Sequence, residues 1–463
     1  MEIRQDMTAA LLRCLKPVLG KCLEAAATSQ GDFAVVEKAV GAAMSAVRRA
    51  VVSTALGECA AAYSVEWNCP DCGARLTRHG DRWRAVVTAE GEGRYRSTRY
   101  RCTRCSRDRY PLETANGLVS GQYTTMAKGV IATAGAEMPY EAAASAVAVR
   151  GIPVSPKQVD RICRDVARWR QQEEERAIAR AEVLRQNDTD ERITELHQWP
   201  GWDALTPALV SLDGGKIRST VMGRDGLEWF EARIGIIGSA VEKVRFPKIY
   251  VGGVKDPDEI FRRLYAAWRS DPRPGRPIIF CADGAEWIWR RVSLYFPHAW
   301  QLLDIFHASQ HVGTAAAAGW GPDSKRHRKW VKQARRMLLT PHGPTRIRRI
   351  LAAQLNHGNP HDAEALAREL AYLDDHRDRM TYCDFRRKGF IVGSGAMESA
   401  VKQTSTERLR LPGMMWSRSG ADHMLTLRAS LLSGDLPSTL RRVHAYRMSQ
   451  AQLFAPTSGH TVN

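Results

Sequence analysis

The chain has 463 residues, with 68 Lys and Arg against 50 Asp and Glu, so its formal charge is +18. Hydrophobic residues make up 44% and charged residues 25%, which excludes a mostly disordered chain, a collagen and a coiled-coil rod. This length predicts several domains, each able to bury its own core. The surplus of positive charge favours polyanionic partners, above all nucleic acid.

The sequence predicts no membrane span and no secretory signal. No uninterrupted apolar run approaches the roughly 18 residues that a bilayer requires. The N-terminus, Met1–Asp6, carries acidic residues and no apolar core followed by a cleavage site. We therefore expect a cytoplasmic, nucleoid-associated protein without a membrane partner.

The positive charge is clustered. Between Arg94 and Arg109 there are seven arginines and a single acid, Asp108. Between Lys325 and Ile350 there are ten Lys and Arg and no acid. Because such blocks repel themselves unless an anion lies beside them, both predict contact with nucleic acid.

Four cysteines form two pairs with metal-binding spacing. Cys69 and Cys72 are separated from Cys102 and Cys105 by 29 residues. Two thiolates on each tight turn can complete a tetrahedral Zn²⁺ site, and Gly73 supplies the backbone freedom that the first turn needs. The alternative is a pair of disulfides, which are rare in a cytosolic chain. We therefore predict a zinc ribbon over residues 66–115, after a helical region over residues 1–65.

Residues 116–170 carry a helix-turn-helix pattern. A helix opens at Met138–Glu141, Gly151–Pro153 forms a turn, and Ser155 caps a second helix. One face of the second helix is an apolar stripe, which predicts burial: Val159, Ile162, Cys163, Val166 and Ala167. The other face suits the major groove of DNA: Lys157, Gln158, Arg161, Arg164 and Arg168. The alternative is a helical hairpin with a solvated basic face.

The remainder of the chain reads as a catalytic core with an insertion. Residues 171–200 predict an exposed linker helix, because their apolar periodicity is weak. From residue 201 the order is three strands, a helix, a strand, a helix and a strand, which is that of an RNase H-like core. The predicted boundaries are 201–312 for its first part, 313–390 for an all-α insertion, 391–432 for the final helices and 433–463 for a C-terminal tail. The predicted fold class is therefore multidomain α+β.

Two apolar strands each end in an acid followed by glycine, at Asp213-Gly214 and Asp283-Gly284. Ligands gather at strand ends in open α/β sheets, and carboxylate oxygens suit Mg²⁺. The alternative for Asp283 is an N-cap of the following helix.

Glu398 is the third candidate acid. It follows the Gly393–Gly395 turn, on the flank of an apolar stripe, where it can face into a site. The alternative is an ion pair with Lys402 one turn later, which contributes at most about 0.5 kcal/mol on a surface.

Asp304-Ile305-Phe306-His307 resembles the C/D-x-x-H motif that follows the second Asp in Mutator-like DDE transposases. With Ala282–Ile288, Gly393–Glu398 and Met414–Arg418, the chain looks like bacterial insertion-sequence transposases of the ISKra group over roughly residues 66–432. This resemblance implies a DDE triad of Asp213, Asp283 and Glu398.

The resemblance further implies two Mg²⁺ ions per active site, or Mn²⁺ in their place, and DNA strand cleavage and transfer. Asp304 competes with Asp283 as second metal ligand, and Glu286 is a near neighbour. We favour Asp283 because it ends the strand, with Asp304 and His307 as a supporting pair.

The implied partners are double-stranded DNA, as terminal inverted repeats and target, and further copies of this chain in a homodimer or higher assembly. Besides the basic face of the second helix, the expected DNA-binding residues are Lys325, Arg328, Lys329, Lys402 and Arg418.

Three alternatives use parts of the same pattern. One is a transposase-derived regulator that reads DNA without cutting it, and another is an RNase H-like nuclease without strand transfer. A glycosidase with Asp213 and Asp283 as its acid pair fits the acids but leaves the ribbon and the charge unexplained.

Overall fold

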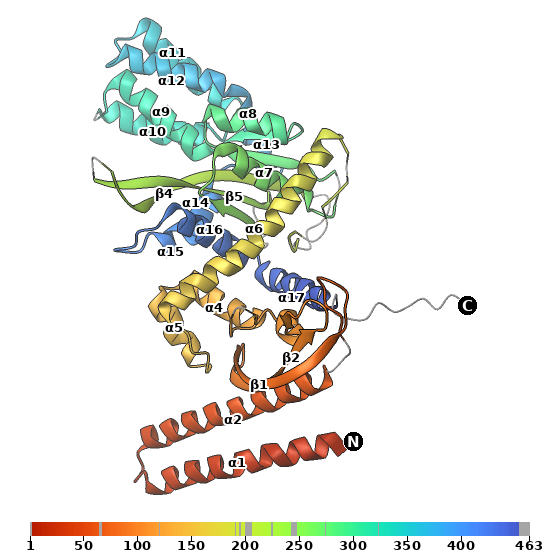
Figure 1. The fold of residues 1–463 in the computed structure, drawn as a ribbon. Coiled ribbons are helices and arrows are strands. Elements are labelled where there is room, and N and C mark those ends of the chain that lie inside the picture. The colour runs from red at the N-terminus through yellow and green to blue at the C-terminus, as the bar shows by residue number, and fades with distance from the viewer. Residues whose placement is uncertain are drawn as a thin grey trace. The chain divides into compact units, whose positions relative to one another are not determined.

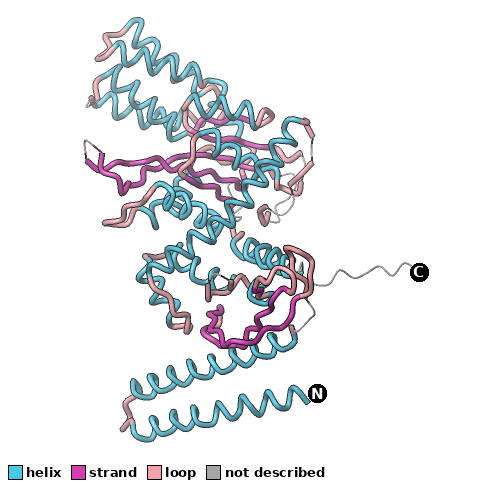
Figure 2. The backbone as a smooth tube through the Cα atoms, in the orientation of Figure 1, coloured by secondary structure: helices cyan, strands magenta, loops and turns pink. Residues whose placement is uncertain are grey.

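The computed structural model describes residues 2–63, 67–119, 121–189, 191–193, 196–199, 206–223, 226–241, 248–273, 275–322 and 324–452. The chain forms two compact units, each considered by itself (Figure 1). Unit 1 comprises Met1–Trp169 and Leu436–Asn463, and unit 2 comprises Arg170–Asp435. The chain is thus a mixed α and β protein, mostly helical, with one sheet in each unit (Figure 2).

Unit 1 is built around a small antiparallel sheet in the order β1-β2-β3. Its elements are α1 (Glu2–Thr28), α2 (Phe33–Ala62), β1 (Leu76–Thr88), β2 (Gly91–Cys102), β3 (Asp108–Arg109), α3 (Pro111–Ala115), α4 (Thr125–Glu137), α5 (Tyr140–Ala148), the first half of α6 (Pro156–Gln186) and α17 (Leu436–Gln452). Helix α2 packs on β2, where Gly93 lets the helix approach because a side chain there would collide with Val52 and Leu56.

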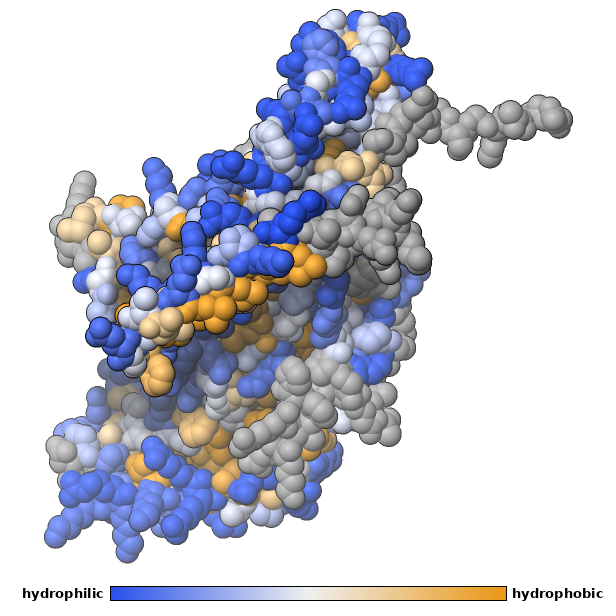
Figure 3. All heavy atoms as spheres, turned by 90° about the horizontal axis from the view of Figure 1, so that it is seen from below, coloured by the Kyte–Doolittle hydropathy of each residue, from blue (hydrophilic) through white to orange (hydrophobic). Residues whose placement is uncertain are grey.

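Helix α2 is long and apolar enough to cross a membrane by length and composition alone, which differs from the expectation of no such segment. Its apolar window has no buried residue, and the exposed apolar side chains of α1 and α2 contribute to a band of hydrophobic atoms between hydrophilic ones (Figure 3). One such helix near the N-terminus is weak evidence for a membrane. The same helix packs on β2, which is compatible with a soluble protein.

Helices α5 and α6 are joined by a turn at which Gly151 adopts φ +73°. The Ser155 hydroxyl accepts the Gln158 N–H at 3.3 Å, and Gln158 Oε1 accepts the Ser155 N–H at 3.0 Å. This reciprocal cap starts α6 at the predicted place. The cap also engages the side chain of Gln158, a residue expected to contact DNA. The predicted apolar stripe of α6 is buried throughout.

Two segments differ from expectation. Residues 433–463 were expected to form a tail, but residues 436–452 form α17, which packs on α3 and α4. Residues 453–463 lie outside the described part. The second half of α6 was expected to be an exposed linker, yet Ala177, Ala181 and Leu184 join the core of unit 2. Alanine side chains are small, so a stripe of them packs closely but produces only a weak helical periodicity of hydrophobicity in the sequence.

Unit 2 contains a five-stranded sheet in the order β6-β5-β4-β7-β8. Its elements are β4 (Ala208–Gly223), β5 (Gly226–Ser239), β6 (Ile249–Gly253), α7 (Pro257–Arg269), β7 (Ile278–Ala282), α8 (Glu286–Tyr295), β8 (Trp300–Leu303), α9 (Ile305–Trp320), α10 (Lys325–Met337), α11 (Gly343–His357), α12 (Ala363–Asp375), the 3₁₀ turn Arg377–Arg379, α13 (Tyr382–Arg387), α14 (Gly395–Val401), the π-helical turn Lys402–Thr406, α15 (Glu407–Leu409) and α16 (Arg418–Leu432).

The order of strands and helices from β4 to β8 is the predicted one. Strand β5 is antiparallel to β4 and β6, whereas β4, β7 and β8 are parallel. Apolar clusters cover both faces: α7 and α8 pack on one, and α9 with the helices that follow it packs on the other. The parallel strands are therefore buried on both sides, as their continuous apolar runs predict.

A buried carboxylate joins distant parts of unit 2. Asp435 accepts hydrogen bonds from His197 Nδ1 at 2.6 Å, the Gln198 N–H at 2.9 Å and Arg170 Nη2 at 3.4 Å. Burial would raise the pKa of Asp435, but His197 and Arg170 outweigh it and the pKa is lowered. The ionised form thus stabilises the fold.

Asp435→Ala should destabilise the protein by about 1–3 kcal/mol, because it leaves the His197 and Gln198 N–H donors without their buried acceptor, whereas Arg170 keeps its ion pairs with Glu173 and Glu174. Since the folded pKa is depressed, this contribution is present above the ordinary carboxyl pKa and is lost as pH falls through the lowered value. Thermal unfolding at neutral and acidic pH checks both statements. Asp378→Ala, at an exposed side chain, is the control. An equal loss in the two variants would contradict the prediction.

Candidate functional site

Two carboxylates lie at matched positions on neighbouring parallel strands. The last residue pair between β4 and β7 is Ser211–Cys281, and Asp213 and Asp283 each follow it by two residues. The Ser211 hydroxyl donates to the Cys281 carbonyl at 2.7 Å and closes the ladder there. Strand β4 does not end at Leu212 as predicted, because its pairing with β5 continues past Asp213. The two acids therefore lie just beyond the point at which β4 and β7 stop pairing.

Both acids line one cavity of about 490 Å³, together with Gly214, Lys216 and Arg233. Although part of Asp213 faces solvent, desolvation raises its pKa, and the nearby carboxylates of Asp283 and Asp304 raise it further. The Gly214 N–H and His307 act in the opposite direction. Two carboxylates held this close make a donor set that fits a divalent cation with oxygen ligands.

The N-cap of α8 is Ala285, so Asp283 does not take the alternative role that the sequence left open. Instead, Asp283 Oδ1 accepts the Ala285 N–H at 2.9 Å in the turn that precedes α8. One carboxylate oxygen is thus used locally, and the residue still lines the cavity. Glu286 forms an ion pair with Arg290 at 2.6 Å and does not line that cavity.

Asp304 is buried and connects three segments. Its Oδ1 accepts the Phe306 N–H at 3.2 Å, which caps α9, and the Ser394 N–H at 2.9 Å, in the turn before α14. Its own N–H donates to the Ala282 carbonyl at 2.8 Å, directly before Asp283. Asp304 Oδ2 is buried and has no hydrogen-bond partner among the described residues. Asp304 does not line the cavity, so its contacts are those of a residue that positions the segments around the acids.

A group of side chains behind Asp283 was not predicted from the sequence. Tyr372 of α12 lies so close to Gly284 that a side chain there would collide with its hydroxyl. Its ring stacks on His311 with centroids 3.5 Å apart, and His311 Nδ1 lies 2.7 Å from Glu369 Oε2. Burial, followed by Asp283, raises the pKa of Tyr372. The sequence offered one signal for this group: His311 follows His307 by four residues, so both lie on one face of the same helix.

Glu398 is exposed on α14, which packs Met397 and Ala400 against β5. The next turn places Val401 beside Gly215 of β4. The structure thus puts the helix of Glu398 next to the strand of Asp213, but Glu398 does not line the cavity of the two aspartates. The alternative ion pair with Lys402 is absent from the described residues. A π-helical turn, a feature frequent at functional sites, follows directly.

The four paired cysteines come together in unit 1, with all their sulfur atoms within 4.8 Å of one another. Cys69 and Cys105 are 3.7 Å apart at Sγ, and Cys72 and Cys102 are 3.4 Å apart. These distances exceed a disulfide bond and are close to the roughly 3.8 Å between sulfurs in a zinc tetrahedron with bonds of about 2.3 Å. The backbone N–H groups of Cys105 and Arg104 help to lower the pKa of Cys102 to about 6. The cluster therefore can hold zinc.

The predicted DNA-binding side chains are mostly exposed. Arg164 and Arg168 form ion pairs on α6 itself, with Asp160 at 2.9 Å and Asp165 at 3.2 Å. By contrast, within the described part of the chain no ion pair involves the following exposed residues: Lys157, Arg161, Lys325, Arg328, Lys329, Lys402 and Arg418. The unpaired charges lie chiefly on α10, whose only buried residue is Ala334.

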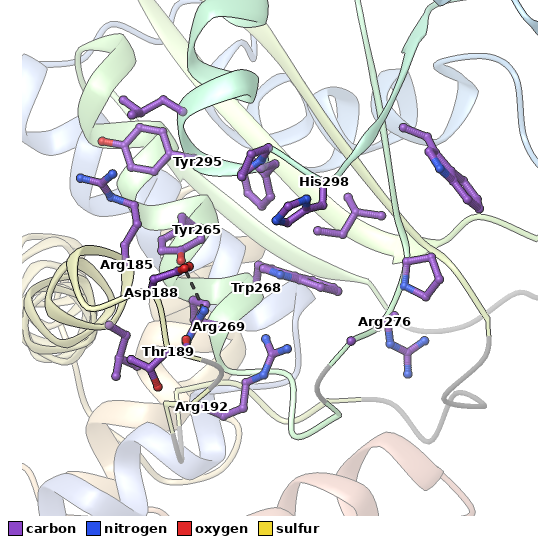
Figure 4. A pocket seen from close by; sticks show the side chains of 18 residues that line it. Arg185, Asp188, Thr189, Arg192, Tyr265, Trp268, Arg269, Arg276, Tyr295 and His298 are labelled. Atoms are coloured by element: carbon purple, nitrogen blue, oxygen red, sulfur yellow. Dashed lines mark hydrogen bonds between the residues drawn. The ribbon is translucent and has the colours of Figure 1, made fainter.

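A second cavity of unit 2, of about 520 Å³, lies near the amino ends of β7 and β8 (Figure 4). Several arginines line it, but they serve the fold. Arg269 donates to the carbonyls of Thr189 and Glu191, and Arg276 forms a 2.8 Å ion pair with Asp271. The candidate functional site is therefore the cavity at the opposite ends of these strands, which the two aspartates line.

The sequence matches no protein-family model, and no curated protein matches it. Among solved structures, the chain is similar to one described as the Drosophila P element transposase strand transfer complex. The identity is 12% and the TM-score 0.25, over 72% of this chain and 83% of the other. A TM-score this low does not establish a common fold.

Cys105→Ser should remove the bound zinc from the purified protein, because three thiolates and a hydroxyl hold the ion much less tightly. Metal content measured by mass spectrometry should fall from one zinc per chain to a small fraction of that. Cys59→Ser, at an exposed cysteine outside the cluster, should keep the metal. Equal zinc in the two variants would contradict the assignment.

Asp213→Asn should raise the thermal stability of the protein without divalent metal at neutral pH. Desolvation and the nearby carboxylates raise the pKa of Asp213 in the folded state, so its ionised form destabilises the fold. A neutral amide at this position avoids both effects. The difference from wild type should vanish at a pH below the ordinary carboxyl range, where Asp213 is protonated in both states. Differential scanning calorimetry at the two pH values tests this, and a variant less stable at neutral pH would refute it.

Proposed function

We propose that the protein is a DNA transposase that cleaves and joins DNA strands through Asp213, Asp283 and Glu398. The observation that carries this proposal is the matched position of Asp213 and Asp283 beyond the last β4–β7 pair. The strand order β6-β5-β4-β7-β8, with β5 antiparallel to its neighbours, supports an RNase H-like core. The ISKra-like motifs around Asp283, Asp304 and Glu398 support the same assignment.

The carboxylates of Asp213 and Asp283, with Glu398 from α14, would hold two Mg²⁺ ions. When bound, such ions activate a water or a 3′-hydroxyl and stabilise the leaving oxygen of a phosphodiester. Glycines 214 and 215 leave the cavity floor open to a sugar-phosphate strand. Lys216 lines the same cavity and makes no ion pair in the described residues, so its ammonium group is available to a phosphate.

Glu398 must approach the two aspartates in this mechanism. Asp304 ties the turn at Ser394 to the end of β7, so it fixes where α14 begins relative to Asp283. Glu398 is exposed and lies outside the cavity lining, so its side chain would have to turn toward Asp213 and Asp283 to hold a cation with them, and a π-helical turn, a feature frequent at functional sites, directly follows α14.

DNA binding would come from several basic elements. The exposed Lys157 and Arg161 of α6 suit a helix-turn-helix that reads terminal repeats. The unpaired lysines and arginines of α10 suit phosphates of the same or the target duplex. The Cys₄ cluster would stabilise the strands that carry the arginines of the ribbon.

Asp283→Asn should lower metal-dependent nicking and joining by at least ~10³-fold, because a metal ligand is worth several kcal/mol in the transition state. Asp304→Asn should keep most activity, because its amide oxygen can still accept the Phe306 and Ser394 N–H groups. The assay uses labelled DNA from the flanks of the gene, with and without Mg²⁺.

DNA affinity is the internal control for the same proteins. Asp283→Asn should bind the labelled DNA as wild type does, and parallel loss of binding and cleavage would indicate a folding role instead. Nicked products without joined ones would identify a nuclease. Binding without any cleavage by wild type, under Mg²⁺ or Mn²⁺, would contradict the proposed activity.

A further inference from the structure

Unit 1 contains a groove that the proposed chemistry does not use. It has a volume of about 1020 Å³ and lies between helix α2 and the β1–β2 hairpin. The α2 wall is made of small residues, including Ser53, Gly57 and Ala60. The Ser53 hydroxyl accepts the Arg94 N–H at 3.0 Å, which fixes this wall to β2. A wall of small side chains leaves the opposite sheet face accessible.

The sheet side of the groove presents an exposed tryptophan. Trp83 is 70% exposed, an unusual state for the largest apolar side chain on a strand. It pairs directly with Arg96 of β2, and the next pair on the same face of the sheet is Ala85–Arg94. Because paired residues project from the same face of a sheet, the indole and both guanidinium groups lie on one surface.

The charge of this surface is positive and largely unneutralised. The Arg96 side chain is 66% exposed, and its nearest acid, Asp81, is 3.9 Å away. Asp81 is already paired with Arg78 at 2.5 Å. Arg94 makes no ion pair within the described residues. The groove is thus lined by three arginines and a single carboxylate, which pairs with two of them.

The opposite face of the same hairpin shows that this arrangement is specific to the groove. There, Arg82 and Arg84 both contact the buried carboxylate of Glu113, and Ser97 donates to it at 2.6 Å. These arginines hold α3 to the sheet. By contrast, Arg94 makes no ion pair within the described residues and Arg96 has only its 3.9 Å contact with Asp81, and Trp83 contributes little to the core.

We propose that this groove binds a segment of single-stranded DNA, with an unpaired base stacked on Trp83 and phosphates on Arg94 and Arg96. Exposed aromatic rings beside cationic side chains are the combination that binds single strands without sequence preference. The bases of a duplex are already stacked on one another, so they cannot cover the indole face. The site is separate from the carboxylates of unit 2 and does not require catalysis.

Trp83→Ala in the zinc-loaded full chain should weaken binding of a mixed-sequence single-stranded oligonucleotide by roughly 5-fold to 150-fold. Affinity for the same sequence as a duplex should change less than about twofold. Trp83→Phe should keep most of the single-strand affinity, because a phenyl ring still stacks. Fluorescence anisotropy with labelled oligonucleotides measures these three affinities. Arg94→Ala should reduce the salt slope by about 0.7, the value for one phosphate of a single strand.

Phe33→Ala is the matched control, because Phe33 is an exposed aromatic residue of unit 1 outside the groove. It should leave both affinities unchanged. Unchanged single-strand affinity of Trp83→Ala would overturn the proposal, as would equal loss for single strand and duplex. A change in sedimentation of Trp83→Ala without a change in DNA affinity would show that a second copy covers the groove, and would also overturn it.

Discussion

The parallel register between β4 and β7 is the constraint on which the candidate site depends. The ladder stops at Ser211–Cys281, so Asp213 and Asp283 emerge side by side at the same height. A slip of one residue would turn one carboxylate to the opposite face of the sheet. The Ser211 hydroxyl, bonded to the Cys281 carbonyl, and the buried apolar faces on both sides oppose such a slip.

The helical insertion is part of the site's support. The Asp304 carboxylate caps α9 and holds the turn before α14, and its backbone N–H bonds the end of β7, so a single residue links these three segments. Tyr372 of α12 packs over Gly284, next to Asp283. Asp304, in the Asp-x-x-His segment, therefore contributes to the site without lining the cavity. Its hydrogen bonds hold the end of β7, directly before Asp283, next to the turn before α14.

Local patterns predicted the elements and the acid pair, whereas long-range packing determined the rest. Continuous apolar runs identified the strands before Asp213 and Asp283, and two Cys-x-x-Cys turns identified the four cysteines that come together in unit 1. The length of β4 was underestimated because its outer half has no parallel strand beside it and pairs with β5 and, at Ser219, with Trp416. The alanine stripe around Ala181 gave too weak a period to predict burial. The exposure of Trp83 depends on how α2 packs on β2, which no local pattern encodes.

If Asp213 and Asp283 share divalent cations, a crystal structure with Mn²⁺ and a DNA end should reveal the ion between them. The anomalous signal of manganese locates the ion independently of the protein. We expect a peak between the carboxylates of Asp213 and Asp283, with Glu398 turned toward it. A peak at the buried Oδ2 of Asp304, or none near the two strand ends, would contradict the account.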